Sequence, residues 1–328
     1  MEALDSVVSV SISLRDDAPV SFRSGGRRAA ADCAEHRLRK TRHFAYVNCS
    51  WPCHRRWSVT GELQLQMVVI SLASASDRRK QVAERFAASA IPWRFEDART
   101  GDGSVVPYDA KAAHANKGRD LFRSEIGCFE SHVSVLRKFV ADQSAAFMIV
   151  CEDDVWIDFG FQFEELIDAM HEAGVHYVRL YSRRVAPVRH IRFWHNRWLV
   201  RYLWEPFGTQ CYLISKAGAE TILGNFKSIG RPIDDELDRF WENGLPAYSI
   251  FPHPVIELQS SSSILRLPVA QSRVTRMRLA ARRGWDRLVA LGYALRTTET
   301  DRRFAQALAR RRSAEVEIHS EESSSRAV

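Results

Sequence analysis

The sequence predicts an α/β domain with a mostly parallel, Rossmann-like sheet and helices on both faces. Apolar runs of strand length occur at residues 67–72 and 147–150, as expected for strands buried on both faces. Segments with helical periodicity lie between such runs. Because a strand, helix, strand order favours parallel pairing through right-handed crossovers, these two observations together indicate the fold class.

Length and charge set the outer limits. With 328 residues, of which 45% are hydrophobic, the chain can hold one large domain with extensions. We expect no secretory signal and find no apolar run long enough to span a bilayer. A net charge of +7 and a pI near 9.2 suggest an anionic partner and leave nucleic acid, phospholipid and phosphorylated sugar open. Four segments are predicted: an N-terminal, poorly ordered extension (1–66), the globular domain (67–268), a basic helical tail (269–312) and a disordered C-terminus (313–328).

The predicted elements follow one another from residue 67. A buried strand leads into a helix that opens at Asp77, and a second strand ends in a turn-rich stretch containing ARTG. The motif GCFESH then leads into an amphipathic helix that ends before the next apolar strand. Further segments are expected as a helix (161–173), a strand (175–181), a strand followed by a helix (207–223), a turn with an acidic helix (231–241) and a last globular stretch (251–264).

Three consecutive carboxylates, Glu152, Asp153 and Asp154, directly follow the apolar run 147–150. In open parallel sheets, ligands bind outside the carboxyl ends of the strands, where these acids would lie. Because side chains at i and i+2 of extended backbone point the same way, Glu152 and Asp154 could face one cation. Carboxylates suit Mn²⁺ or Mg²⁺, which often accompany phosphates. The alternative is a solvated acidic turn.

Two other segments carry candidate binding residues. Ser131 and His132 in GCFESH are expected near a helix start, where free N–H groups would favour an anion; the alternative is a helix cap and a structural histidine. Residues 183–205 interleave arginines with tryptophans and phenylalanine. That segment would suit a large anionic acceptor, or it could be a hairpin with aromatic residues in the core and arginines in water.

The basic tail and the cysteines each allow two interpretations. An arginine-rich amphipathic helix within residues 270–312 could lie on an anionic membrane surface or pack on the domain as a solvated helix. Cys33, His36, Cys49 and Cys53 have spacing loosely similar to a zinc knuckle but lack its turn glycines, so incidental residues are the favoured interpretation. The cysteines of the globular part are expected to be reduced and buried.

Several blocks in order give the chain a resemblance to glycosyltransferase family 25, which includes bacterial lipooligosaccharide galactosyltransferases and collagen β-galactosyltransferases. The blocks are VVISL with DRR (68–79), ARTG (98–101), EIGCFESH (125–132), IVCEDDV (149–155), FGTQCYLISKAGA (207–219), and PID followed by FPHPVIE (232–257). The resemblance covers about residues 67–268. Its most specific feature is GCxxSH followed some twenty residues later by a strand ending in EDD.

The resemblance implies a single GT-A-type domain and inverting, metal-dependent transfer of a sugar, often galactose, from a UDP-sugar to a glycan such as lipopolysaccharide or lipooligosaccharide. Glu152 and Asp154 correspond to metal ligands for Mn²⁺ or Mg²⁺. The family positions near the donor nucleotide correspond to Leu72, Arg78, Ser131, His132, Asp153 and Thr209. The chain departs from the family pattern at Ser71, Glu130 and Cys151, which puts the donor preference in doubt more than the reaction.

Inverting transfer needs a base for the acceptor hydroxyl and a Lewis acid for the departing diphosphate. Asp234, with Asp235 next, is the predicted base because the PIDDE block falls on the expected acceptor side. His253 is interpreted as a loop residue more readily than as a metal ligand. The expected acceptor is an anionic glycan or lipid-linked oligosaccharide, and the expected location is the cytoplasm, free or peripheral on the inner face of its membrane.

Two rival functions stay open at this point. Clustered acids also serve metal-dependent nucleotidyltransferases and phosphohydrolases. Arginines interleaved with aromatic residues also occur in nucleic-acid-binding proteins. No nucleic-acid partner is expected, however, because the basic segments flank an acidic site and do not form one basic motif.

Overall fold

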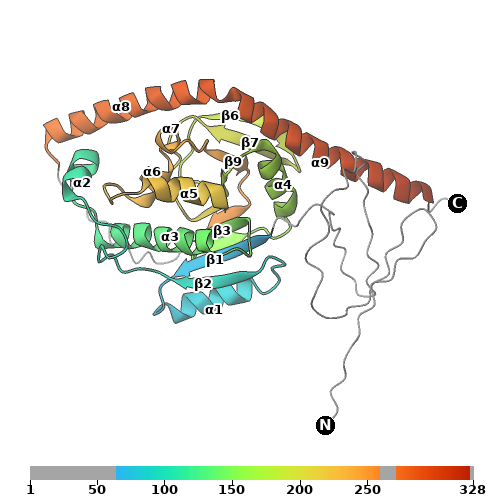
Figure 1. Cartoon of the computed structure of the whole chain (residues 1–328), viewed down its shortest axis with the longest axis horizontal. Coiled ribbons are helices and arrows are strands. Elements are labelled where there is room, and N and C mark those ends of the chain that lie inside the picture. Colours follow the sequence, from blue (N-terminus) through green and yellow to red (C-terminus); the bar gives the residue numbers. More distant parts are fainter. Residues whose placement is uncertain (1–63, 259–270, 326–328) are drawn as a thin grey trace, which may run out of the picture. The chain divides into compact units, whose positions relative to one another are not determined.

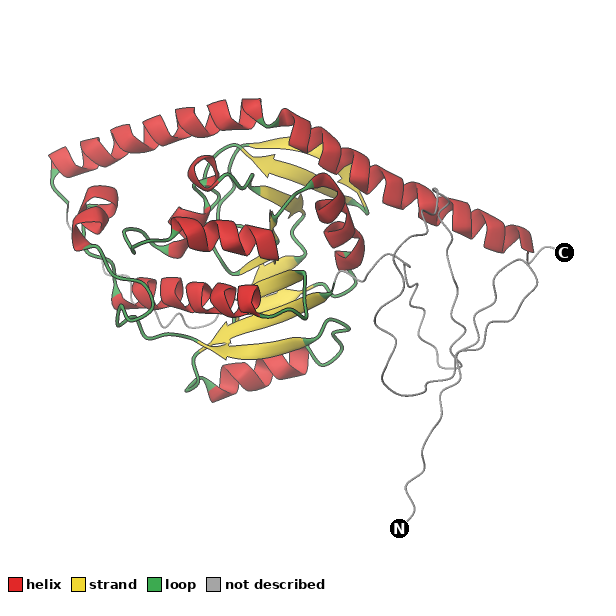
Figure 2. Cartoon of the chain, viewed as in Figure 1, coloured by secondary structure: helices red, strands yellow, loops and turns green. Residues whose placement is uncertain are grey.

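The computed structural model describes residues 64–258 and 271–325, and the side chains up to residue 311. One eight-stranded sheet organises this part of the chain (Figures 1 and 2). The strands are β1 (Leu65–Ser71), β2 (Trp93–Asp97), β3 (Phe147–Glu152), β4 (Val155–Ile157), β5 (Tyr177–Arg179), β6 (Val188–Trp194), β7 (Arg197–Tyr202), β8 (Cys211–Ser215), β9 (Tyr248–Phe251) and β10 (Val255–Glu257). The helices are α1 (Ser76–Arg85), α2 (Ala110–Lys117), α3 (Arg123–Ala141), α4 (Phe163–Ala173), α5 (Lys216–Asn225), α6 (Ile233–Leu237), α7 (Phe240–Asn243), α8 (Arg273–Arg296) and α9 (Thr298–Ser325).

The strand order is β2-β1-β3-β8-β5-β9-β7-β6, and six of these eight strands point the same way. Only β8 and β7 run in the opposite direction. The predicted α/β class with a mostly parallel sheet is therefore confirmed. Strands β4 and β10 form a separate antiparallel pair. Next to this pair, the Leu258 N–H donates a hydrogen bond to the Asp154 carbonyl oxygen, which ties the segment after β3 to the segment after β10.

Helices cover both faces of the sheet, as predicted. Alternate residues of β1 enter opposite cores: Met67 and Val69 pack with α1, α4 and α9, whereas Val68 and Ile70 pack with α3, α5 and α6. Strand β3 alternates in the same way, and its apolar residues are fully buried. Because both faces of these strands are covered, their sequences are continuous apolar runs. This packing on both faces thereby fixes the positions of the carboxyl ends of β1 and β3.

The C-terminal helices pack on this domain. Phe304, Ala307 and Leu308 of α9 lie in the same core cluster as α4. Asp301, also on α9, accepts hydrogen bonds from Arg201 on β7 and from Tyr248 on β9. Of the residues predicted as a basic tail (269–312), those from Arg273 on are helical, and Phe304, Ala307 and Leu308 contribute to the core. None of the described helices combines the length and apolar character that a bilayer span requires.

The arginine and aromatic segment contains a hairpin, β6–β7. Trp194 is buried, while Phe193 and Trp198 remain partly exposed. The turn places His195 and Asn196 at positive φ, which two-residue hairpin turns require. Of the two interpretations of this segment, the hairpin is found for residues 188–202. One of its arginines departs from the prediction of a solvated face, because Arg201 is fully buried and forms an ion pair with Asp301.

Some predicted elements differ in extent. The acidic helix expected over 231–241 is broken into α6 and α7, with Asp238 and Arg239 between them. Helix α9 continues to Ser325, through residues expected to be disordered, since the run SAEVEIHSEE contains good helix formers beside its serines. The predictions for residues 1–63, including the extension and the zinc-knuckle alternative, lie outside the described residues.

Candidate functional site

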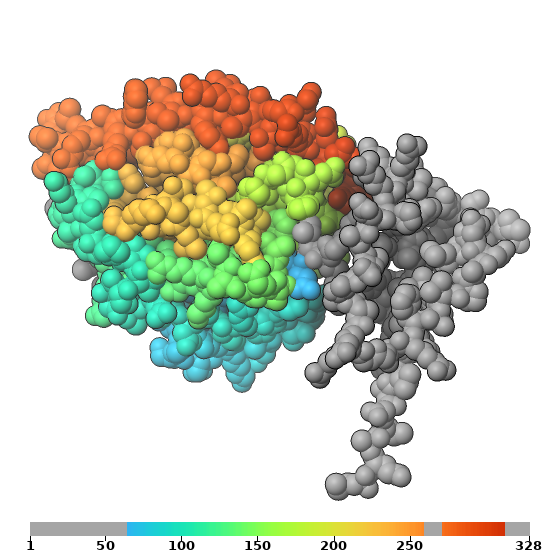
Figure 3. Space-filling view, in the orientation of Figure 1, coloured from blue at the N-terminus to red at the C-terminus, as the bar shows by residue number. Residues whose placement is uncertain are grey.

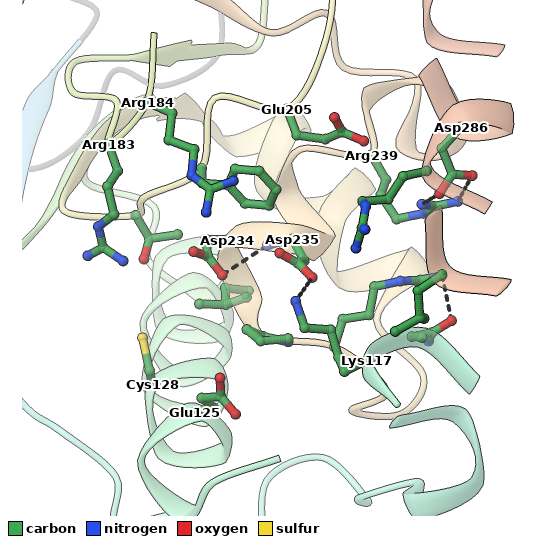
Figure 4. A pocket seen from close by; sticks show the side chains of 18 of the residues that line it. Lys117, Glu125, Cys128, Arg183, Arg184, Glu205, Asp234, Asp235, Arg239 and Asp286 are labelled. Carbon is green, nitrogen blue, oxygen red and sulfur yellow. Dashed lines mark hydrogen bonds and ion pairs between the residues drawn. The ribbon is translucent and has the colours of Figure 1, made fainter. Parts of the chain in front are cut away.

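The candidate site is a cavity of about 570 Å³ at the carboxyl end of β3. Its walls come from α2, α3, the segment 205–209, α6 and α8, so residues far apart in sequence meet there (Figure 4). The charged side chains that line it are Lys117, Arg119, Glu125, Glu152, Arg183, Arg184, Glu205, Arg231, Asp234, Asp235, Arg239, Arg282, Arg283, Asp286 and Arg287. A cavity with this many charges of both signs suits a polar, anionic ligand and a cation better than an apolar one.

Glu152 ends β3 and lines this cavity. The Thr209 hydroxyl donates a hydrogen bond of 3.0 Å to one of its carboxylate oxygens. Burial, together with the negative charges of Asp154 and Asp234, raises the pKa of Glu152 to about 7. The carboxylates in this region therefore repel one another, which is the electrostatic setting in which a bound cation is stabilised.

The next two acids face different environments. Asp153 is buried and engaged: the Ser71 hydroxyl donates to it at 2.6 Å and Arg78 at 3.1 Å. Asp154 has one buried carboxylate oxygen, Oδ1, without a hydrogen-bond partner among the described residues. Burial and the charges of Glu257 and Asp153 raise the pKa of Asp154 to about 6. An unpartnered buried oxygen with a raised pKa fits a metal ligand, whereas Asp153 has the contacts of a structural residue.

Asp234 and Asp235 lie in the first turn of α6, on the wall of the cavity. Asp235 is held in an ion pair with Lys117 of α2 at 2.6 Å. Asp234 accepts a hydrogen bond from the Asp235 N–H through its Oδ1, and no ion pair to it is found among the described residues. Figure 4 shows Asp234 on the side toward Arg183 and Arg184, and Asp235 turned to Lys117. Of the two predicted bases, Asp235 is thus paired with a lysine side chain, whereas Asp234 has no ion-pair partner among the described residues.

Residues 64–237 match the model of "Glycosyltransferase family 25 (LPS biosynthesis protein)", which is just over half of the chain. The match spans β1, ARTG, GCFESH, the EDD run and Asp234. The chain belongs to glycosyltransferase family 25.

Curated relatives agree with this assignment. Over 203 residues the chain is 26% identical to "Lacto-N-neotetraose biosynthesis glycosyltransferase LgtE" of Neisseria gonorrhoeae, covering 57% of this chain and 72% of the relative. It is also 26% identical to the LgtB protein of Neisseria meningitidis, covering 57% and 74% of the two chains. A rat protein named "Probable inactive glycosyltransferase 25 family member 3" is 28% identical, with 57% of this chain and 37% of the relative covered. Of the function classes that the sequence left open, family membership selects glycosyl transfer.

The family 25 motifs ARTG and GCxxSH meet in the structure. Gly101 lies against the α3 backbone, and an added Cβ there would come within 2.0 Å of the Arg123 carbonyl oxygen. A Cβ on Gly127 would come within 2.5 Å of the Arg99 carbonyl oxygen. Ser131 completes the contact by accepting a hydrogen bond from the Arg99 N–H at 2.8 Å. Both glycines are needed because the turn packs directly on the helix backbone.

The predicted position of Ser131 and His132 near a helix start is wrong. Helix α3 begins at Arg123, eight residues before Ser131, because Glu125 accepts a hydrogen bond from the Phe122 N–H and thereby caps the helix. Ser131 and His132 therefore lie in mid-helix, where N–H groups are already bonded, and both are buried. The alternative prediction, a hydrogen-bonded structural histidine, holds for the Nδ1 atom of His132, which lies 3.0 Å from the Tyr212 hydroxyl oxygen.

Of the residues that the resemblance places near the donor nucleotide, Thr209 lines the cavity, but Leu72, Arg78, Ser131, His132 and Asp153 do not. Leu72 follows β1 and is half-buried, and Arg78 is paired with Asp153. Of these residues, Arg78 supports the EDD run through its ion pair with Asp153, whereas Ser131 and His132 bond Arg99 and Tyr212. His253 hydrogen-bonds Ser182 and the Ile250 carbonyl oxygen, as expected for a loop residue.

Sequence reasoning missed two groups at the site. Cys128 lines the cavity, although it was interpreted only as a buried thiol; its four-residue spacing from His132 on one helix face was the available signal. Arg282, Arg283 and Arg287 of α8 also line the cavity. No local signal places them there, because α8 follows β3 by more than 100 residues and reaches the site only through packing.

Proposed function

We propose that this family 25 enzyme transfers a sugar, galactose in the first instance, from a UDP-sugar to a hydroxyl of a lipopolysaccharide or lipooligosaccharide glycan, with inversion at the anomeric carbon. The observation that carries the proposal is the lining of one cavity. It contains Asp234, a carboxylate without an ion-pair partner among the described residues, the partly buried Glu152, and several arginines. A base, a cation site and a phosphate site are the three components that such a transfer requires.

Asp234 is the proposed base. A base for the acceptor hydroxyl must be ionised and must reach the bound substrate. Asp234 lines the cavity, and its partner Asp235 is occupied by Lys117. In this proposal the Asp234 carboxylate takes the proton of the acceptor hydroxyl as that oxygen attacks the anomeric carbon. Asp235 and Lys117 hold the start of α6 in position.

Glu152 and Asp154 are the proposed ligands of a divalent ion, Mn²⁺ or Mg²⁺. Both carboxyl groups have pKa values raised by burial and by neighbouring carboxylates, and one oxygen of Asp154 is buried without a partner among the described residues. When bound there, the ion would act as a Lewis acid for the departing UDP. Thr209 orients Glu152, and Arg78 with Ser71 anchors the intervening Asp153.

The arginines of α8 are the proposed contacts for the donor diphosphate. Arg282 and Arg283 line the cavity, and neither has a carboxylate partner within 4 Å among the described side chains. Some other cavity cations are already neutralised, as Arg119 is by Glu125 and Arg239 by Asp286. Guanidinium groups bind phosphate oxygens through paired N–H donors, so unpaired arginines are the ones available to a diphosphate.

The outer face of α8 suggests how a lipid-linked acceptor is reached. By helical spacing, Val274, Met277, Trp285, Leu288 and Leu295 share one face, and all five side chains are exposed. Exposed arginines of α8 flank this face, and its one acid, Asp286, is paired with Arg239. Figure 3 shows α8 lying along the surface of the domain beside α2. We propose that this face contacts the anionic inner surface of the cytoplasmic membrane.

The test is a screen of UDP-sugars for Mn²⁺-dependent UDP release in the presence of a lipooligosaccharide acceptor. We expect release of UDP together with sugar transfer, and loss of both in Asp154→Ala. A phosphohydrolase or nucleotidyltransferase would instead release phosphate or monophosphate. No UDP from any donor, with the acceptor present, would reject the proposal.

A further inference from the structure

Three side chains with metal-binding atoms converge beside the cavity, which Cys128 and Glu152 line and His132 does not reach. The Cys128 sulfur, a ring nitrogen of His132 and a carboxylate oxygen of Glu152 all lie within 4.8 Å of one another. Cys128 and His132 are one turn apart on the same face of α3, and Glu152 is the last residue of β3. We propose that these three residues form a binding site for Zn²⁺ or a divalent ion of similar softness, separate in chemistry from the Mn²⁺ or Mg²⁺ site at Glu152 and Asp154.

The imidazole of His132 is the observation that points to a ligand. The side chain is fully buried, and its Nε2 atom has no hydrogen-bond partner among the described residues. Its Nδ1 atom is fixed by the Tyr212 hydroxyl, and the two rings stack with centroids 5.6 Å apart. Leaving a buried polar atom unpaired is unfavourable, so such an atom calls for an explanation such as a bound ligand.

The surrounding contacts resemble the outer shell of a metal site. Metal-binding histidines usually use their second ring nitrogen for a hydrogen bond that sets tautomer and ring orientation, as Tyr212 does for His132. Metal-binding carboxylates are usually hydrogen-bonded as well, as Glu152 is by Thr209. One ligand from the helix, His132, and one from the strand end, Glu152, are therefore each held by a separate neighbour.

The ligand types select the ion. A thiolate and an imidazole favour Zn²⁺, whereas Mn²⁺ and Mg²⁺ prefer oxygen ligands only. Bond lengths of about 2.0–2.3 Å place the ligand atoms of tetrahedral Zn²⁺ roughly 3.5 Å apart, so binding draws the three side chains together by about 1 Å. Because Cys128 and Glu152 line the cavity, the fourth coordination position opens toward it, where water or a phosphate oxygen could bind.

The inference does not rest on glycosyl transfer, since metal binding is measured without substrate. It does have a consequence for the proposed Mn²⁺ site, because Glu152 belongs to both sets. One carboxylate serving two ions means that Zn²⁺ and Mn²⁺ compete. Bound Zn²⁺ would then weaken Mn²⁺ binding, and this effect would be absent in Cys128→Ser.

Cobalt substitution tests the site through a signal that only a thiolate ligand gives. The protein used is the full chain with Cys33, Cys49 and Cys53 replaced by serine, since those thiols could also bind the ion. After removal of bound metal with a chelator, one equivalent of Co²⁺ should give a near-ultraviolet thiolate-to-cobalt charge-transfer band and the intense visible bands of four-coordinate cobalt. One equivalent of Zn²⁺ should abolish both.

Variants assign the signal to its ligands. Cys128→Ser should eliminate the charge-transfer band, and the matched control Cys211→Ser, at a buried thiol of β8, should retain it. Tyr212→Phe leaves every ligand in place and should weaken Co²⁺ binding by about tenfold or more; this variant decides if Cys128→Ser does not fold. Absence of the band in the parent protein, its persistence in Cys128→Ser, or unchanged affinity in folded Tyr212→Phe would overturn the proposal.

Discussion

The two sides of the cavity are built differently. On the sheet side, Glu152 is the last residue of β3 and Asp234 lies in the first turn of α6, so packing and hydrogen bonds fix the backbone at both. On the opposite side, Arg282 and Arg283 project from α8, are exposed, and have no described carboxylate partner. A preorganised acidic side suits bond making and breaking, whereas exposed, unpaired cations suit capture of an anionic ligand. Substitutions on the two sides should therefore affect different kinetic constants.

The largest effect is expected on the acidic side. Asp234→Asn keeps the shape of the side chain but removes the proposed base, so kcat should fall by roughly 10³-fold while the donor KM changes little. The matched variant Asp235→Asn loses only the ion pair with Lys117 and should retain a much higher kcat. Steady-state kinetics of UDP release measure both. Equal losses in the two variants would contradict the assignment of the base.

On the arginine side, the double variant Arg282→Ala and Arg283→Ala should raise the donor KM by about 100-fold and leave kcat nearly unchanged. The reason is the loss of charge-assisted contacts to the diphosphate, each on the order of 1.5 kcal/mol or more. Arg273→Ala with Arg276→Ala removes the same charge from α8 at positions outside the cavity lining and is the control. A similar rise in KM in the control would mean that net charge alone, not position, binds the donor.

Sequence patterns predicted the sheet side better than the arginine side. The apolar runs of β1 and β3 are local signals of buried strands, and they place Glu152 correctly at a strand end. The start of α3 was misplaced because Glu125, its capping residue, had not been recognised. Arg282 and Arg283 reach the cavity through the packing of α8 over α2 and α7, a long-range contact that no periodicity encodes.

The outer face of α8 extends the comparison, since its apolar residues point away from the cavity arginines. Trp285→Ala with Leu288→Ala should reduce partitioning onto phosphatidylglycerol-containing vesicles by about tenfold, because apolar area is lost at the interface. Point variants are preferred to truncation, since removal of the helices would also remove core residues such as Phe304. Vesicle sedimentation measures the effect, and donor kinetics without vesicles should stay unchanged. Unaltered partitioning would exclude this face as a membrane contact.

The smallest expected effect is a loss of folding stability at acid pH. Burial lowers the pKa of His253 to about 4 from its usual value of 6.5. Between these two values the unfolded chain binds a proton that the folded chain does not, so folding stability must fall as pH decreases from about 6.5 to 4. The contribution is on the order of 1 kcal/mol after allowance for partial exposure. Urea unfolding at pH 6.5 and 4.5 should show a smaller acid-induced loss in His253→Gln, and an equal loss would refute the prediction.

The most direct test of the account is the anomeric configuration of the product. A base at Asp234 that activates the acceptor for direct attack requires inversion, so an α-linked UDP-galactose donor should yield a β-linked galactoside, as read from the anomeric proton coupling in NMR spectra. A purely α-linked product would contradict the proposed role of Asp234 and the division of work between the two sides of the cavity.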